Sequence, residues 1–269
     1  MNEVSSSEGW YFAFTIDAAV LQVACGIGFV ALAVLLAHRL KLGLSKEIAL
    51  AALRATVQLA AVGALIALVF KYEALAIAFV AAMVSTAALT SGGRLKGVPQ
   101  ARARAIAAIG IPAVGAAAIL IAVGAFEPTP EASIPTAGIL IGGAMTATTL
   151  TGRRLLEGLR DDADAIETRL ALGDRIRDAL APTVRQAIRT GLVPAIDQTR
   201  NVGIVTLPGT FVGLVLGGAS PGEAARIQLT VLLTLLAVEL LSAIIIAELI
   251  VRPRIAPGER LREDVAHGD

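Results

Sequence analysis

Hydrophobic positions along this chain gather in long runs, and most charged positions lie between the runs. A helix needs about 20 apolar residues to cross the hydrocarbon core of a bilayer, so each run is a candidate membrane-spanning helix. The fifth and sixth runs are short and rich in glycine, which leaves six crossings as an alternative to seven. The pattern predicts an all-α, polytopic membrane protein with about seven transmembrane helices. The runs cover residues 17–37, 48–70, 74–91, 105–126, 134–151, 203–218 and 225–251.

Composition supports a membrane protein. The 269 residues are 56% hydrophobic and 17% charged, whereas a soluble domain carries about 25% charged residues. The formal net charge of +1 gives no support for nucleic-acid binding. Cys25 is the only cysteine, so no intrachain disulfide can form. We expect a single membrane domain over residues 1–269.

Basic residues indicate the orientation, because cytoplasmic loops keep Lys and Arg near the membrane. In the seven-span arrangement, every Lys and Arg except Arg54, Lys71 and Arg226 lies on one side. This predicts a multi-pass protein of the cell membrane, with its N-terminus outside and its C-terminus in the cytoplasm. The longest connection on the cytoplasmic side, at about 152–202, has apolar residues at helical spacing among its charges. We expect it to be an interfacial helical region that binds a partner.

Within this region, "IETRLALGD" places Glu167 six residues before Gly173, and "IRTGLVP" follows. The order resembles the Glu-Ala-Ala loop of ATP-binding-cassette (ABC) import permeases, where a short helix, a glycine turn and a second helix dock on the ATPase subunit. The resemblance implies that Glu167, Arg169, Gly173 and Pro194 couple this chain to such a subunit. An ordinary amphipathic helix explains the same pattern equally well.

Several further motifs resemble the iron-export ABC permease family, which includes bacterial iron-exporter membrane subunits and plant aluminium-tolerance relatives. The similarity extends over about residues 48–241. It implies a membrane subunit that forms a homodimer and works with a separate cytoplasmic ATP-hydrolysing partner. It also favours export over import. The motifs are "LRATVQLAAVGALI", "IPTAGILIGGAMTA", "IETRLALG", "AIRTGLVPAID" and "VGIVTLPGTFVGLVLGGASPGEAARIQLTVL".

The chain departs from the family pattern at positions that can touch cargo. It has "LPGTFVG" where relatives have Leu-Pro-Gly-Met-Met-Thr-Gly, and "IGGAMTA" where they have Ile-Gly-Asn-Ser-Met-Asn-Ala. The family's Pro-x-x-Asn becomes Pro194-Ala-Ile-Asp197. Methionine and asparagine are lost, so the cargo stays open between a metal ion, a metal chelate, a nucleotide sugar and a small organic solute.

The sequence contains no Gly-x-x-x-x-Gly-Lys-Ser/Thr motif, so this chain lacks the usual phosphate cradle for ATP. We therefore expect no enzyme activity and no cofactor in this chain, with ATP and Mg bound by the partner subunit. His38 and His267 have no Cys or His at ligand spacing, and metal binding is undetermined. The rival function is a secondary transporter or channel driven by an ion gradient. An intramembrane enzyme is a more distant third, because no nucleophile–base set appears.

The run at 203–218 contains a predicted helix break. Pro208 removes a backbone donor and Gly209 lets the chain bend, which a membrane tolerates only where protein or cavity water satisfies the freed groups. Gly209, Gly213 and Gly217 lie four apart on one helical face, where another helix could approach closely. These residues are candidates for a gate, and tight packing without a gate is the alternative.

Ionisable residues inside membrane spans usually face a cavity or a partner, because each costs about 2.5–3.5 kcal/mol at the helix centre on insertion scales. Glu239, in "LLAVELLSA", lies near the middle of the last run. Arg54 and Gln58 share one face of the second run. We predict that these three residues line a substrate pathway; a structural Glu239–Arg54 pair is the alternative.

Overall fold

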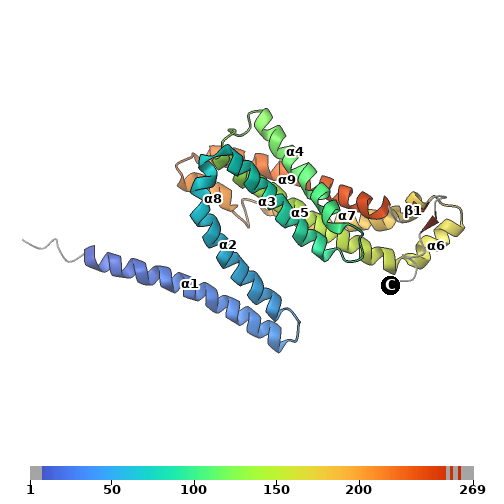
Figure 1. Ribbon diagram of the computed structural model, residues 1–269, viewed down its shortest axis with the longest axis horizontal. Helices are drawn as coiled ribbons and strands as arrows, with labels where there is room; N and C mark the ends of the chain where they lie inside the picture. Colours follow the sequence, from blue (N-terminus) through green and yellow to red (C-terminus); the bar gives the residue numbers. More distant parts are fainter. Residues whose placement is uncertain (1–7, 253–254, 257–259, 262–269) are drawn as a thin grey trace, which may run out of the picture. The chain divides into compact units, whose positions relative to one another are not determined.

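The structure is a computed structural model that describes residues 8–252, 255–256 and 260–261. Its regular elements are helices apart from two strands of two residues each, which confirms the predicted all-α, polytopic fold (Figure 1). The N-terminal residues, which are predicted to face outside the cell, and His267 lie beyond the described residues. The elements are α1 (Glu8–Arg39), α2 (Ser45–Lys71), α3 (Glu73–Arg94), α4 (Ala101–Ala122), α5 (Pro130–Asp161), α6 (Ala163–Ala171), α7 (Ile176–Asn201), α8 (Gly209–Leu216), α9 (Pro221–Val251), β1 (Ile255–Ala256) and β2 (Arg260–Leu261).

Six of the described helices are long and apolar enough to cross a membrane: α1 through its segment Val20–Arg39, then α2, α3, α4, α5 and α9. Their starts and ends follow simple signals. Pro130 and Pro221 occupy the first turns of α5 and α9, where the missing N–H costs no helical bond. Ser220 caps α9 by accepting a hydrogen bond from the Glu223 N–H at 3.2 Å.

The chain divides into two compact units, Met1–Leu68 and Val69–Asp269. The first contains α1 and most of α2, joined by a tight turn in which Lys41 and Gly43 adopt positive φ angles. The second contains the remaining helices. The candidate functional site belongs to the second unit.

The predicted sixth span, 203–218, is not one continuous helix. Residues 202–208 are non-helical, and only Gly209–Leu216 form a helix, α8. At 1.5 Å per residue, its eight residues extend about 12 Å, well short of the hydrocarbon core. The break is therefore longer than the Leu207-Pro208-Gly209 turn predicted from sequence. Pro208 itself is the residue that precedes α8.

Helix α5 is central to the second unit and packs against α3, α4, α7 and α9. Two clusters of buried apolar residues form the core. One joins α3, α4, α5 and α9 through residues such as Ile109, Leu140 and Val238. The other joins α5, α7 and α9 through Leu155, Leu180 and Ile250. Glu239 lies on α9 between the residues that this helix contributes to each cluster.

Helix α7 runs back along α5 in the opposite direction. Thr183 donates a hydrogen bond to Asp162 at 2.7 Å, Gly191 lies against Thr151, and Gln198 lines a cavity together with Gly142. The last part of the region predicted to be cytoplasmic, about 152–202, thus packs along the bundle as the end of α7, and its side of the membrane stays a prediction. The end of α7 lies beside the parts of α5 and α9 that hydropathy assigns to the membrane. The sequence did not predict that α7 packs along α5, because α7 is too polar to be identified as a membrane span.

Candidate functional site

Glu239 is the charged residue nearest the middle of the second unit's apolar helices. Only 6% of its surface is exposed. Between Arg226 and Glu248, α9 carries no other ionisable side chain. Among the described residues of this unit, Glu239 forms no ion pair. A carboxyl group placed in this way costs free energy, so Glu239 is a candidate functional residue.

Gly143 of α5 makes room for the Glu239 carboxyl group. A Cβ atom at position 143 would overlap Glu239 Oε1 and would lie 2.5 Å from Leu235 Cδ1. Leu235 and Glu239 are four residues apart, so both project from one face of α9 toward α5. Only glycine at position 143 allows this approach. The second glycine of "IGGAMTA", Gly143, thus sets the distance between α5 and α9 at the level of the carboxyl group.

A cavity of about 270 Å³ opens beside Glu239, between α5, α7 and α9. Its walls combine the carboxyl group with a hydroxyl and an amide, from Thr146 and Gln198. Glycine residues form much of the remaining wall, so the backbone is within reach of a bound molecule. This combination of oxygen and nitrogen groups suits a cation or a polar solute. The lining residues are Gly138, Ile139, Gly142, Gly143, Thr146, Gly191, Pro194, Ala195, Gln198, Leu235 and Glu239.

Pro194 lies in the wall of this cavity. It stands inside α7, where it has no N–H to donate and leaves the Thr190 carbonyl without its usual helical partner. From the start of α7 at Ile176, position 194 is about 27 Å away along the helix, at 1.5 Å per residue. Pro194 is therefore remote from the glycine turn. Its predicted role in coupling to an ATPase subunit stays a prediction, and the structure adds that Pro194 lines the Glu239 cavity.

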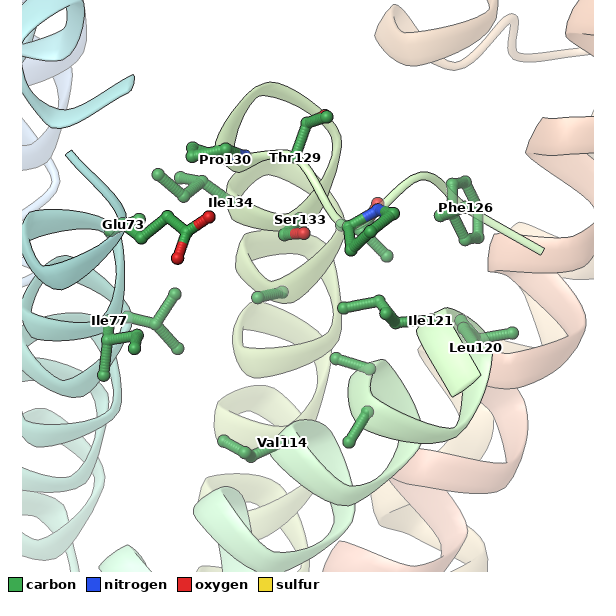
Figure 2. Close-up of a pocket in the computed structure, with 17 residues that line it drawn as sticks. Glu73, Ile77, Val114, Leu120, Ile121, Phe126, Thr129, Pro130, Ser133 and Ile134 are labelled. Atoms are coloured by element: carbon green, nitrogen blue, oxygen red, sulfur yellow. The ribbon is translucent and has the colours of Figure 1, made fainter. Parts of the chain in front are cut away.

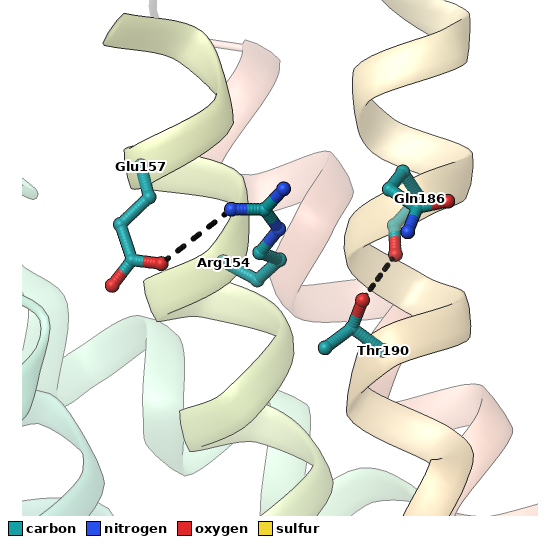
Figure 3. Close-up of polar contacts among 4 residues, drawn as sticks. All are labelled: Arg154, Glu157, Gln186 and Thr190. Atoms are coloured by element: carbon teal, nitrogen blue, oxygen red, sulfur yellow. Dashed lines mark hydrogen bonds and ion pairs between the residues drawn. The ribbon is translucent and has the colours of Figure 1, made fainter. Parts of the chain in front are cut away.

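The contact between α5 and α7 is close but has few polar links across it. A Cβ atom at Gly158 would lie 2.6 Å from Thr183 Cγ2, and one at Gly191 would overlap Thr151 Oγ1. Figure 3 shows that the neighbouring polar contacts stay within each helix: Arg154 pairs with Glu157 at 3.8 Å, and the Thr190 hydroxyl donates to the Gln186 carbonyl at 3.0 Å. The Thr151 hydroxyl is buried and has no hydrogen-bond partner.

The predicted coupling turn forms a helix–turn–helix. Gly173 follows α6 with a φ angle of +97°, which L side chains rarely adopt. Arg169 Nε donates to Asp174 Oδ2 at 2.9 Å and closes the turn. Leu172, at its tip, is 81% exposed, and Glu167 is exposed on α6. The turn is therefore a defined and exposed element at the start of α7.

The three glycines predicted to receive another helix have no such contact within the described chain. Cβ atoms at Gly209 or Gly213 would meet nothing within 4 Å, and one at Gly217 would meet only carbonyl oxygens of its own helix. Gly213 instead lines a cavity of about 820 Å³ between the α4–α5 connection, α5, α8 and α9. Glu127, Glu131, Glu223 and Arg226 also line this outer cavity.

A further pocket, of about 370 Å³, lies between α3, α4 and α5 (Figure 2). Its walls are mainly apolar, with Ile77, Val114 and Ile121 among them. Glu73 is its only charged residue. The pocket contains none of the predicted site residues, so it does not compete with the Glu239 cavity as the candidate pathway.

Arg54 and Gln58 lie on α2, in the first unit, and both are exposed there. The described second unit thus brings together Glu239 and Pro194 of the predicted site residues, while Pro208 and Gly213 lie elsewhere.

Sequence reasoning missed Gly143, Thr146, Gly191 and Gln198. The signal available was the double glycine of "IGGAMTA", which we interpreted only as a departure from a family motif. Among the described residues, no cluster of three or more His, Cys, Asp or Glu is placed to hold a metal ion.

Comparison with known proteins gives a consistent set of relatives. The rice (Oryza sativa subsp. japonica) protein named UPF0014 membrane protein STAR2 is 37% identical over 84% of this chain and 80% of its own length. Protein ALUMINUM SENSITIVE 3 of Arabidopsis thaliana is 34% identical over 79% of each chain. An Escherichia coli (strain K12) protein named probable iron export permease protein FetB is 33% identical over 83% of this chain and 87% of its own.

No solved structure matches the chain. The rice relative is named as a membrane protein and the E. coli relative as a permease, in agreement with the six long apolar helices. The profile of one family, described as uncharacterised protein family UPF0014, matches residues 20–254. This multi-pass membrane protein therefore belongs to the UPF0014 family.

Proposed function

We propose that the chain is the membrane-spanning permease subunit of an ABC-type exporter, powered by ATP hydrolysis in a separate cytoplasmic subunit. The observation that carries this proposal is the path of α7. One helix of 26 residues, about 39 Å long at 1.5 Å per residue, begins at the Gly173 turn and ends beside the Glu239 cavity. A force applied at the turn is thereby delivered to the cavity wall by a single element.

The geometry supports a lever of this kind. At its start, α7 is tied to α5 by the Thr183–Asp162 hydrogen bond and by buried residues such as Leu180 and Leu159. Further along, the contact consists of glycine against threonine, with Arg154–Glu157 and Gln186–Thr190 contained within their own helices (Figure 3). Small surfaces without crossing hydrogen bonds can shift at low cost. Closure of the ATPase subunits would then move Pro194 and Gln198 relative to Glu239.

The relatives support export as the direction, because the E. coli protein carries the name of a probable iron export permease. The cavity chemistry is compatible with a metal ion or a small polar solute as cargo. The proposed orientation is the one predicted from the basic residues. The N-terminus is outside, and the α6–α7 turn and the C-terminus are cytoplasmic. Two copies of the chain and two ATPase subunits would form the complete transporter, with ATP and Mg held by the ATPase subunits.

The test is Gly173→Val in membranes that also contain the cognate ATPase subunit. Valine strongly disfavours a φ of +97°, so the turn must change shape, and we expect loss of ATPase co-purification and of ATP-driven cargo transport. Gly124→Val is the matched control for co-purification. Gly124 has a φ of +71°, also with open space around it, but it lies in the α4–α5 connection at the opposite end of α5.

Normal ATPase association and transport in Gly173→Val would reject this docking site. The rival function, a secondary transporter or channel, predicts that the chain moves cargo along an ion gradient in vesicles that contain no ATPase subunit. Under the proposed function, the chain alone shows no concentrative transport, and adding the ATPase subunit with ATP restores it.

A further inference from the structure

The pocket between α3, α4 and α5 has one polar end and an apolar interior. Its volume of about 370 Å³ falls in the range of small-molecule sites. Glu73, in the first turn of α3, is the only charged residue in the lining. Figure 2 shows its carboxyl group at the end of the pocket that Thr129 and Ser133 border, with Val114 toward the other end. Apart from Glu73 and the hydroxyl-bearing residues, the lining is apolar.

The apolar part of the pocket follows the helices for about two turns. On α3, Val80 lies seven residues after Glu73, which is about 10 Å along the helix at 1.5 Å per residue. On α4, Val114 lies the same distance from Ile121, and Ile121 is nearer the Glu73 end (Figure 2). The space is therefore elongated, with a carboxyl group at one end and aliphatic side chains along the rest.

The carboxyl group of Glu73 has no cationic partner in the described second unit. It forms no ion pair there, and the pocket lining contains no Lys or Arg. The polar end lies where the membrane-spanning helices α3 and α5 begin. At this depth a bilayer changes from polar headgroups to hydrocarbon. The site thus suits a molecule with a charged head and an apolar body, and the unopposed carboxyl group favours a positive head.

We propose that this pocket binds a hydrophobic organic cation, with an ammonium-type head at Glu73 and an apolar body that extends toward Val80 and Val114. A phospholipid fits less well, because its phosphate would lie near Glu73 with no basic residue in the lining to pair with it. A neutral chain would leave the carboxyl group without a partner. The pocket shares no lining residue with the Glu239 cavity, so the proposal is independent of the transport pathway.

Photoaffinity labelling of the full chain in phosphatidylcholine vesicles tests the site. The probe is a decyltrimethylammonium ion with a diazirine at the end of its chain, and decanol with the same diazirine is the neutral probe. After illumination, mass spectrometry locates the label. Because the head is held at Glu73, we expect the cation to label the segments around Val80 and Val114, at the far end of the pocket.

Glu73→Gln isolates the contribution of the charge. We expect it to lower labelling by the cation about fivefold, the effect of losing one partly exposed charge pair. Labelling by the neutral probe should not change. Glu127→Gln is the matched control. Glu127 is also exposed and lies in the α4–α5 connection, but it lines the outer cavity and not this pocket.

Ala118→Phe isolates the contribution of the apolar space. Ala118 lines the pocket and is exposed, so a phenyl ring can enter the space without displacing the buried core. Labelling by both probes at Val80 and Val114 should fall. Ala122→Phe is the control, because Ala122 is exposed one turn further along α4 and does not line the pocket.

Three results would overturn the proposal. The first is the absence of label around Val80 and Val114 in the wild type. The second is equal labelling of the wild type and Glu73→Gln by the cation, which would leave an apolar pocket without charge selectivity. The third is displacement of the probe when phosphatidylethanolamine is added to the vesicles, which would make a membrane lipid the occupant. The assay needs neither ATPase nor cargo, so its outcome is separate from that of the proposed function.

Discussion

Helix α5 meets α9 and α7 through two different kinds of contact. Toward α9, Gly143 admits Leu235 and the Glu239 carboxyl group, and buried apolar residues such as Val238 and Ile246 continue the contact on both sides. Toward α7, Gly191 presses on Thr151, whose buried hydroxyl has no hydrogen-bond partner. An unsatisfied buried polar group costs about 1–3 kcal/mol.

The difference indicates which wall of the cavity is fixed and which can move. The α9 contact buries large apolar side chains in the central core, so any displacement there would open cavities and cost several kcal/mol. The α7 contact is made by small groups and contains a buried hydroxyl group without a hydrogen-bond partner, which a shift of α7 could satisfy. We interpret α9 as the fixed wall that holds Glu239 and α7 as the movable wall.

The largest effect should come from Glu239→Gln, which keeps the shape of the side chain and removes its charge. We expect the variant to insert, to assemble with its ATPase subunit and to retain basal ATP hydrolysis, but to lose most cargo-stimulated hydrolysis. Within the described second unit Glu239 has no ion pair, so removing the charge strands no partner there. The measurement is ATP hydrolysis by the reconstituted pair as cargo is added.

Arg54→Gln tests the alternative that Glu239 and Arg54 form a structural pair. If the two residues form a buried pair, each single variant should lose about 3–5 kcal/mol of stability by stranding its partner. The double variant should then recover much of that loss. Stable, fully active Glu239→Gln protein would contradict both the pathway role and the pair.

Gly143→Ala tests the fixed wall. A Cβ atom there would overlap Glu239 Oε1 and crowd Leu235, so α5 and α9 must separate or the carboxyl group must turn away. Overpacking of this kind costs about 1–3 kcal/mol. We expect a lower unfolding midpoint in detergent together with weaker cargo stimulation. Gly142→Ala is the matched control, because a Cβ atom at position 142 would meet nothing within 4 Å.

Equal behaviour of the Gly143→Ala and Gly142→Ala proteins would show that the α5–α9 distance is not set by Gly143. A loss of stability without any change in cargo stimulation would limit the role of Gly143 to packing.

Sequence was sufficient for the fold class because lipid imposes a strong rule: long apolar runs must become helices that satisfy their own backbone. The ends of α2 and α9 fall within a few residues of the predicted runs for this reason. Glu239 was identified for the same reason, since one carboxylate stands out in an otherwise apolar stretch. These features depend on local composition alone.

The remainder depends on which helices pack together, and local composition does not determine that. Helix α7 reads as an ordinary charged surface helix, yet Gly191 and Ala195 place it against the bundle. The apolar run at 203–218 reads as a span, yet only α8 forms there. The roles of Gly143, Thr146 and Gln198 arise from the pairing of distant segments, which is a property of the tertiary structure.

Gly191→Ala tests the movable wall. Alanine gains about 0.5–1 kcal/mol over glycine inside a helix. Its Cβ atom would overlap Thr151 Oγ1 and lie 3.1 Å from Thr151 Cβ, so we expect the clash to exceed this gain by about 1 kcal/mol. Combining Gly191→Ala with Thr151→Ala removes the overlapping hydroxyl and should recover part of the loss. Strictly additive effects in this double-mutant cycle would mean that the two residues do not interact.

The smallest effect, and the most specific to the α7 contact, should come from Thr151→Val. Valine has nearly the shape of threonine but no hydroxyl group, so the substitution removes the buried donor and acceptor that have no partner. The variant should be about 0.5–1 kcal/mol more stable than the wild type, because an unsatisfied buried group is lost at little cost in packing. Thr149→Val is the matched control on the same helix. The Thr149 hydroxyl is paired, with the Met145 carbonyl at 2.7 Å and the Ser91 hydroxyl at 3.0 Å, so its removal should lower stability.

If the orphaned hydroxyl also marks a contact that rearranges during transport, Thr151→Val should favour the present arrangement of α7 and slow ATP-driven turnover, while Thr149→Val leaves turnover near normal. Opposite shifts of stability in the two variants, with slower turnover only in Thr151→Val, would establish α7 as the movable wall; a stabilised Thr151→Val protein with unchanged turnover would leave the hydroxyl a packing defect and remove the basis for distinguishing α7 from α9.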